Sequence, residues 1–253
     1  MNAERRREDV RIAVVMPAMN AARTLEQTVA GIPPGWADDV ILVDDKSTDE
    51  TIAVARRLPI RVIWHPHNVG YGGNQKTCYL EALQTGADVI VMLHPDGQYE
   101  PTLIPELVTP ILRGEADLVL GSRLAVPGMA RDGGMPLYKY VSNRVLTTLE
   151  NVAMKTRLTD LHTGYRAYSR EFLLTIPFLR NSLDFSFDSE VLLQAAAFGF
   201  RIEEVPARSV YTEDASSISF GPASVYGAKT VWLVGRLLLH RAGVVTSRRL
   251  FQP

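Results

Sequence analysis

Two polar clusters in this sequence have the residue types and spacing that could hold a divalent metal and a phosphorylated ligand. The first contains Asp44 and Asp45, and the second contains His94, Asp96 and Gln98. Carboxylate and amide oxygens are the ligands that Mg²⁺ and Mn²⁺ prefer, and such a metal can bridge diphosphate oxygens. A single acidic turn would be weak support, because Asp is common in turns. Two clusters at one site favour a functional interpretation.

Each cluster directly follows a short apolar run that we predict to be a β-strand. Helical spacing, as in Ala21 to Ile32, occurs between these runs. Such alternation predicts an α/β fold with a mostly parallel sheet and helices on both faces, and ligands bind beyond the carboxyl ends of its strands. The expected strands are Arg11 to Pro17, Val40 to Val43, Arg61 to Trp64, Val89 to Leu93 and Leu118 to Leu120.

Composition limits the classes of protein that this chain can represent. Its 253 residues are 46% apolar and 22% charged, as expected for one large globular domain, and the net charge of −1 argues against nucleic-acid binding. Cys78 is the only cysteine, so no internal disulfide can form and a reducing compartment is expected. The segment from Met1 to Arg11 lacks the apolar core of a signal peptide, which predicts a cytoplasmic protein.

Five motifs are spread along the chain: Val15-Met16-Pro17-Ala18-Met19-Asn20, the Val-Asp-Asp-x-Ser-x-Asp run from Val43 to Asp49, Asp96-Gly97-Gln98, Gly121-Ser122-Arg123 and the run from Asp160 to Arg166. These motifs resemble those of glycosyltransferase family 2, whose fold is called GT-A, over nearly the whole chain. Their order and spacing look like those of the dolichyl-phosphate or polyprenyl-phosphate sugar synthases within that family. The resemblance implies an inverting enzyme that transfers a sugar from a nucleotide-sugar donor to a polyprenyl phosphate.

The same resemblance implies roles for the residues at the first three motifs. Asp44 and Asp45 would hold the base and ribose of the donor, with Pro17, Asn20 and Asp96 also at the donor site. The family's second acidic motif usually reads Asp-x-Asp with a Gln two residues later.

Here His94 replaces the first Asp of that motif, whereas Asp96 and Gln98 match the other positions. His94 could bind metal as a neutral imidazole, which suits Mn²⁺ better than Mg²⁺. Alternatively, His94 only hydrogen-bonds a neighbour. We therefore expect Asp96, Gln98 and His94 to be the candidate metal ligands, with Mg²⁺ or Mn²⁺ as cofactor.

Two basic residues are candidates for binding the acceptor phosphate. Arg123 follows a predicted strand, and a guanidinium can grip phosphate through two hydrogen bonds. Lys139 lies near a second basic position of the subgroup, or is simply a solvated surface lysine. We take Asp96, Arg123 and Asp188 as the catalytic residues. Asp188 would act as general base if the acceptor were a hydroxyl, whereas a lipid phosphate, with a second pKa of about 6, needs no base.

The C-terminal segment is basic and amphipathic. From Ser224 to Pro253 it has five cationic residues and no carboxylate, together with apolar residues that include Trp232. We expect a domain at residues 1–222 and a segment at 223–253 that binds an anionic membrane surface peripherally, or else a helix packed on the domain with its basic side in water.

Two other hypotheses remain open from the sequence. One is a family 2 enzyme acting on a saccharide or small-molecule hydroxyl, and the other is a nucleotide-sugar-binding protein without turnover, which the substitution at His94 favours. A Rossmann dehydrogenase is disfavoured, because no Gly-x-Gly-x-x-Gly follows the first strand. The sequence leaves the sugar, the base, the acceptor and the oligomeric state open.

Overall fold

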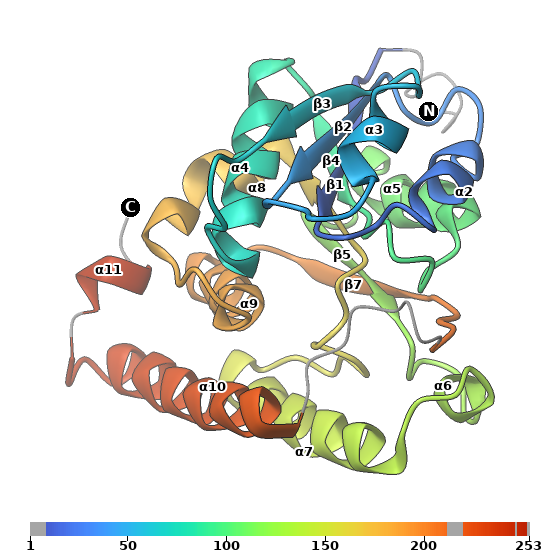
Figure 1. Ribbon diagram of the computed structural model, residues 1–253. Helices are drawn as coiled ribbons and strands as arrows, with labels where there is room; N and C mark the ends of the chain where they lie inside the picture. The colour runs from blue at the N-terminus through green and yellow to red at the C-terminus, as the bar shows by residue number, and fades with distance from the viewer. Residues whose placement is uncertain (1–8, 212–219, 246, 252–253) are drawn as a thin grey trace.

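The computed structural model describes residues 9–211, 220–245 and 247–251. In these ranges the chain forms a seven-stranded sheet in the order β3-β2-β1-β4-β6-β5-β7 (Figure 1). The strands are β1 (Ile12–Ala18), β2 (Asp39–Asp44), β3 (Arg61–Trp64), β4 (Val89–Met92), β5 (Leu118–Ser122), β6 (Arg166–Ser169) and β7 (Ile202–Pro206). All neighbouring strands pair in parallel except β6, which is antiparallel to both β4 and β5. The predicted mostly parallel sheet is therefore confirmed.

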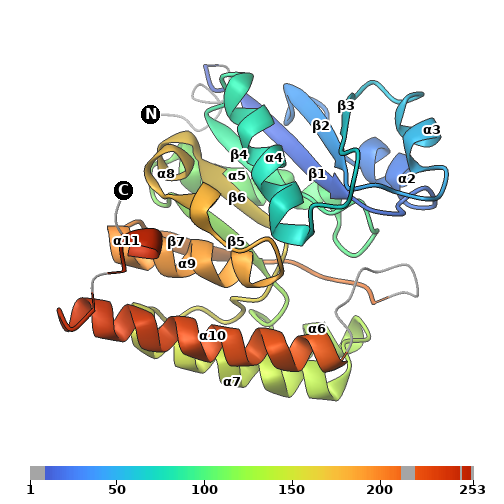
Figure 2. The ribbon, with the colours of Figure 1, turned by 60° about the vertical axis from the view of Figure 1, so that its left-hand side comes forward.

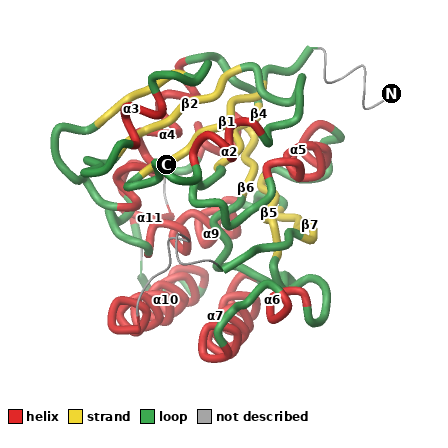
Figure 3. Tube along the Cα trace, turned by 45° about the vertical axis from the view of Figure 1, so that its right-hand side comes forward, coloured by secondary structure: helices red, strands yellow, loops and turns green. Residues whose placement is uncertain are grey.

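Helices cover both faces of the sheet (Figure 3). They are α2 (Leu25–Ala30), α3 (Thr51–Ala55), α4 (Tyr71–Gln84), α5 (Ile104–Leu112), α6 (Met129–Asp132), α7 (Leu137–Met154), α8 (Arg170–Thr175), α9 (Ser186–Phe198), α10 (Phe220–Arg241) and α11 (Arg248–Phe251), with 3₁₀ turns η1 (Pro101–Leu103) and η2 (Phe178–Arg180).

The pleat of β1 explains why both faces need covering. Ala13 and Val15 belong to a core shared with α4 and α9, whereas Ile12, Val14 and Met16 belong to a second core shared with α2 and α5. All five side chains are fully buried. A strand that is apolar on both faces must lie between two layers of helices, so β1 and its neighbours form the rigid centre from which the polar loops extend.

Helices α7 and α10 lie side by side, with α9 between them and the sheet (Figure 2). The sequence boundary expected between residues 222 and 223 falls inside α10, which starts at Phe220. Leu233 and Leu237 on α10 are buried in the core that α9 shares, because this helix has an apolar side of its own. The C-terminal helix is thus packed on the domain, and membrane binding by its exposed side stays a prediction.

Candidate active site

The carboxyl ends of β1, β2 and β4 meet at one edge, as parallel pairing requires. Pro17 is buried within β1, and the loop that follows it is tied to the loop after β2. The Asn20 amide N–H donates to Ser47 Oγ over 2.8 Å, and the Asn20 side-chain oxygen accepts from the Thr48 amide over 2.9 Å. Asn20 adopts a left-handed φ of 56°, which Asn tolerates better than most residues. These hydrogen bonds hold the loops after β1 and β2 in a fixed arrangement at the predicted donor site.

The acidic pair after β2 is buried and heavily hydrogen-bonded. Asp44 accepts from the amide and hydroxyl of Ser47. Asp45 accepts from the backbone amides of Val69 and Gly70 at 2.8 and 3.1 Å, and its Oδ1 lies 3.0 Å from His65 Nδ1. A carboxylate has about four acceptor positions. Asp45 therefore positions the loop before α4 and has capacity for one further donor, such as a base or ribose group. Its role toward the donor stays a prediction.

Two glycines in the stretch Val69 to Gly73 are needed for a close approach of backbones. Gly70 has φ +87°, and a Cβ there would come 2.6 Å from the Leu183 carbonyl oxygen. A Cβ on Gly72 would come 2.5 Å from the carbonyl oxygen of Ser182. The glycines thus let the start of α4 pack against the loop before α9.

His94 and Asp96 follow β4 at the same edge. Asp96 is 8% exposed and accepts from the Gln98 amide over 3.0 Å. The ring of His94 stacks parallel to that of Tyr71, with centroids 5.7 Å apart. Burial lowers the pKa of His94, although the charges of Asp96 and Asp188 oppose this effect. His94 is therefore neutral near pH 7 and can offer a ring lone pair.

This donor set fits a divalent metal ion. A neutral imidazole beside a carboxylate suits Mn²⁺, which accepts both nitrogen and oxygen ligands. Gly164 packs closely against one edge of the ring, because a Cβ there would lie 2.8 Å from His94 Nε2. No three His, Cys, Asp or Glu side chains of the described residues form a complete metal site. Asp96, Gln98 and His94 would therefore share the ion with diphosphate oxygens and water, and this assignment stays a prediction.

Asp188 points toward the same region from the first turn of α9. It accepts from the Tyr71 hydroxyl over 2.8 Å and from Gln75 Nε2 over 3.1 Å. The buried Arg166 guanidinium lies 3.6 Å from Asp188 Oδ1. The side chain remains 14% exposed, so it can still contact a ligand. The structure thus orients Asp188 through three partners, and its catalytic role stays a prediction.

Arg123 occupies a different environment from the one we expected. Its guanidinium forms a bidentate ion pair with the Asp160 carboxylate, with Nε–Oδ2 and Nη2–Oδ1 distances of 2.6 and 2.9 Å. It also donates to the His162 carbonyl and to the Tyr211 hydroxyl. Burial alone would raise the pKa of Asp160, but the charge and hydrogen bonds of Arg123, together with the effect of His162, lower that pKa overall. The charge of Arg123 is thus already balanced within the protein, and direct contact with an acceptor phosphate stays a prediction.

Lys139 lies next to this ion pair. Its ammonium is 5.8 Å from the centre of the Tyr211 ring, and the Tyr211 hydroxyl accepts from Arg123 Nη1 over 2.9 Å. Burial and the charge of Arg123 both lower the pKa of Lys139. Arg123 is paired with Asp160, whereas an anion beside Lys139 would stabilise the charged form of this lysine.

Sequence reasoning missed several polar residues of this site. His65, Tyr71, Gln75 and Tyr211 contact the predicted site residues, but they lie in loops or at a helix start and match no motif that we had singled out. Tyr71 directly follows Gly70, so the Gly-rich stretch was the one available signal. Arg166 is the last residue of the fifth motif, but the motif predicts no role for it.

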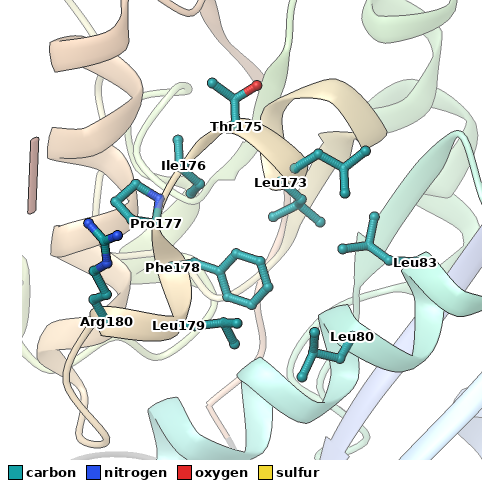
Figure 4. A pocket seen from close by; sticks show the side chains of 10 residues that line it. Leu80, Leu83, Leu173, Thr175, Ile176, Pro177, Phe178, Leu179 and Arg180 are labelled. Atoms are coloured by element: carbon teal, nitrogen blue, oxygen red, sulfur yellow. The ribbon is translucent and has the colours of Figure 1, made fainter. Parts of the chain in front are cut away.

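A separate hollow of about 400 Å³ lies between α4, α8 and η2 (Figure 4). Leu80 and Leu83 line it on one side, and Leu173 and Phe178 line it on the other. Arg180 is the one charged residue in its lining. A nucleoside diphosphate needs several polar partners, so this hollow does not suit the donor.

Comparison with known proteins decides the family. The family model described as "Glycosyl transferase family 2" matches residues 13–176, more than half of the chain. The chain belongs to glycosyl transferase family 2. It is therefore an enzyme of the glycosyltransferase class, in line with the motifs, and the alternative of a binding protein without turnover is set aside.

Two curated relatives cover most of this family 2 chain. One is the "UDP-N-acetylglucosamine--dolichyl-phosphate N-acetylglucosaminyltransferase" of Methanococcus voltae, which is 29% identical over 94% of this chain and 98% of the relative. Another is the "Undecaprenyl-phosphate mannosyltransferase" of Micrococcus luteus, which is 28% identical over 81% of this chain and 85% of the relative.

Solved structures confirm the GT-A fold. Glucosyl-3-phosphoglycerate synthase from Mycobacterium tuberculosis, in complex with Mn²⁺, UDP and phosphoglyceric acid, matches with a TM-score of 0.68 at 22% identity. The match covers 97% of this glycosyltransferase and 83% of that chain. Identity at this level supports the fold and leaves the acceptor open. No helix among the described residues is long and apolar enough to cross a membrane.

Proposed function

We propose that this glycosyltransferase transfers a sugar from a nucleotide-sugar donor to a polyprenyl phosphate, with inversion at the anomeric carbon. The observation that carries the proposal is the position of Lys139. It lies beside Arg123 at the start of α7, between the exposed apolar residues Tyr138 and Val141. A lipid phosphate needs a cation for its head and an apolar surface for its chain, and this part of α7 presents both.

The printed names of the two curated relatives support this choice of acceptor, since both name a polyprenyl-type phosphate. The donor would lie at the strand edge, with its nucleoside on Asp44 and Asp45. Asp96 and His94 would hold Mn²⁺ or Mg²⁺, which when bound supplies charge stabilisation for the diphosphate leaving group.

The rest of the proposed reaction depends on how the protein positions the acceptor phosphate. A phosphate monoester with a second pKa of about 6 is a dianion near neutral pH and attacks without a general base. Lys139 would hold its oxygens, and Asp160 would keep Arg123 in place behind it. One displacement by a phosphate oxygen opposite the departing diphosphate inverts the anomeric centre. Asp188 would then hold a sugar hydroxyl rather than remove a proton.

Transfer assays with three acceptors test this proposal. Polyprenyl phosphate, the matching polyprenol, and 3-phosphoglycerate would each be offered with a panel of radiolabelled nucleotide sugars and Mn²⁺. We expect product only with polyprenyl phosphate. Equal transfer to the polyprenol would favour the hydroxyl-acceptor alternative with Asp188 as base, and transfer only to phosphoglycerate would overturn the lipid acceptor.

We further propose that the α7–α10 pair lies on the membrane that holds this acceptor. Apolar side chains are exposed along both helices, with Val145 and Val152 on α7 and Val225, Trp232 and Leu239 on α10. The exposed positions on α10 recur every seven residues, so they share one side of the helix. Apolar area of this kind at the surface favours a lipid interface.

We expect the cations of α10 to contribute less to membrane binding than their number in the sequence predicts. Lys229 pairs with Asp184, Arg236 stacks over Trp232 at 4.7 Å, and Arg241 donates to backbone carbonyls. We therefore expect flotation with vesicles to depend on Trp232 more than on salt. Trp232→Ala should lower recovery with the vesicles at high and low salt alike. Unchanged recovery of this variant would contradict docking through this face.

A further inference from the structure

A buried polar hub joins the α7–α10 pair to the Arg123 ion pair. His162, in the loop before β6, is at its centre. Its backbone amide donates to Asp160 Oδ1 over 3.2 Å, and its carbonyl accepts from Arg123 Nη2 over 2.8 Å. The backbone of this one residue therefore contacts both members of the ion pair. Any shift of His162 must alter the position of the Arg123 guanidinium.

The side chain of His162 contacts both helices of the pair. Its Nε2 lies 3.1 Å from Glu150 Oε2 on α7, and its Nδ1 lies 2.6 Å from the Tyr226 hydroxyl on α10. The Tyr226 hydroxyl also lies 3.0 Å from Ser189 Oγ on α9, next in sequence to Asp188. Helices α7 and α10 thus meet at the imidazole, and α9 joins them through the Tyr226 hydroxyl.

Because this hub is buried, its polar groups must keep their partners close. The Glu150 side chain is completely buried, and that of His162 is 5% exposed. Glu150 and His162 Nε2 lack a well-aligned hydrogen bond among the described residues, so the 3.1 Å contact is what compensates the carboxylate. A buried carboxylate is costly unless a partner stays close. The helices and the loop must therefore keep one relative arrangement.

We propose that His162 is a positioning residue that links the seating of α7 and α10 to the acceptor end of the active site. Resting on the proposed function, this inference gives the membrane-facing helices a route to Arg123 through the His162 backbone and to Asp188 through Tyr226 and Ser189. When α10 sits correctly on α7, Tyr226 and Glu150 fix the imidazole, and the imidazole fixes the loop that holds Arg123. The donor site after β1 and β2 shares none of these contacts.

Two substitutions of His162 each remove a different contact of the imidazole, either the one with Glu150 or the one with Tyr226. His162→Asn places an amide near Nδ1 and keeps a partner for Tyr226, whereas His162→Gln reaches the position of Nε2 and keeps a partner for Glu150. Tyr226→Phe removes only the hydroxyl on α10. Thr148→Ala, which removes an exposed hydroxyl on α7 that bonds the Arg144 carbonyl, serves as the control.

We expect Tyr226→Phe and His162→Gln each to lower kcat/KM for polyprenyl phosphate about two- to tenfold, the effect of one hydrogen bond. The donor KM should stay unchanged. Tyr226→Phe also removes the contact that His162→Gln cuts, so the double variant should lose no more than Tyr226→Phe alone. A double variant whose loss is the product of the two single losses would overturn the link, as would an equal rise in the donor KM. Thr148→Ala should match the wild type in both constants.

Hydrogen exchange separates this inference from the proposed function. In Tyr226→Phe, the amides of residues 160–164 should exchange faster than in the wild type, with no change around Asp45. This comparison needs no acceptor. If the wild type fails to use polyprenyl phosphate, the proposed function is wrong while the exchange result still decides the link. Unchanged exchange at residues 160–164 would overturn the link even in an active enzyme.

Discussion

Replacement of Lys139 by alanine separates acceptor binding from folding. Lys139 is half-buried and lies over the Tyr211 ring, with no ion pair to an acidic residue in the ranges that the structure describes. Its removal therefore leaves no buried charge without a partner. We expect Lys139→Ala to fold and melt like the wild type while losing affinity for the acceptor phosphate.

The size of the loss follows from the contact that disappears. A hydrogen bond to a charged group is worth about 1.5–3 kcal/mol, which corresponds to roughly ten- to a hundredfold in kcat/KM. The Lys139 ammonium is partly open to water, which screens its charge. We therefore expect the lower end, about tenfold for polyprenyl phosphate, with the donor KM unchanged.

The pH dependence gives a second signature. The folded pKa of Lys139 is below its ordinary value, because burial and the Arg123 charge disfavour the ammonium. The cationic form is the one that binds phosphate, so the acceptor KM should rise as the pH increases through this lowered pKa. Lys139→Arg should keep a low acceptor KM at alkaline pH, because a guanidinium stays charged.

Initial rates at saturating donor, with polyprenyl phosphate in detergent micelles, measure these effects. Arg144→Ala is the matched control, since it removes one exposed cation from the same helix. Equal losses in Lys139→Ala and Arg144→Ala would show that the effect is general attraction to the micelle. A normal acceptor KM in Lys139→Ala would refute the phosphate site.

Three further substitutions test the rest of the site. Arg123→Ala should lower the free energy of unfolding by about 3–5 kcal/mol in urea titrations, because it leaves the buried Asp160 carboxylate without its partner, and a loss below about 1 kcal/mol would contradict the ion pair's role in the fold. Asp96→Ala should abolish Mn²⁺-dependent donor binding in calorimetry with an unchanged circular dichroism spectrum, so that normal titration would remove Asp96 from the metal site. Asp45→Asn should raise the donor KM more than it lowers kcat, whereas a pure kcat effect would indicate a transition-state role.

The sequence located the strand ends that build the site, but missed two strands of the sheet. β1, β2 and β4 are continuous apolar runs, which is the pattern of strands buried on both faces. β6 has only four residues, two of them Arg166 and Ser169, and carries no such pattern. It forms because both of its neighbours, β4 and β5, offer unpaired backbone groups.

The sequence by itself determined the family motifs, the alternation of strands and helices, and the placing of Asp45 and Asp96 at one edge. These follow from local patterns, because residue types and periodicity are read over a few neighbouring positions. The tertiary structure alone decided that Arg123 is paired with Asp160, that α10 is buried against α9, and that His162 meets Glu150 and Tyr226. Such pairings join segments far apart in the chain. A buried charge takes whichever partner the packing brings within reach, and no local spacing encodes that choice.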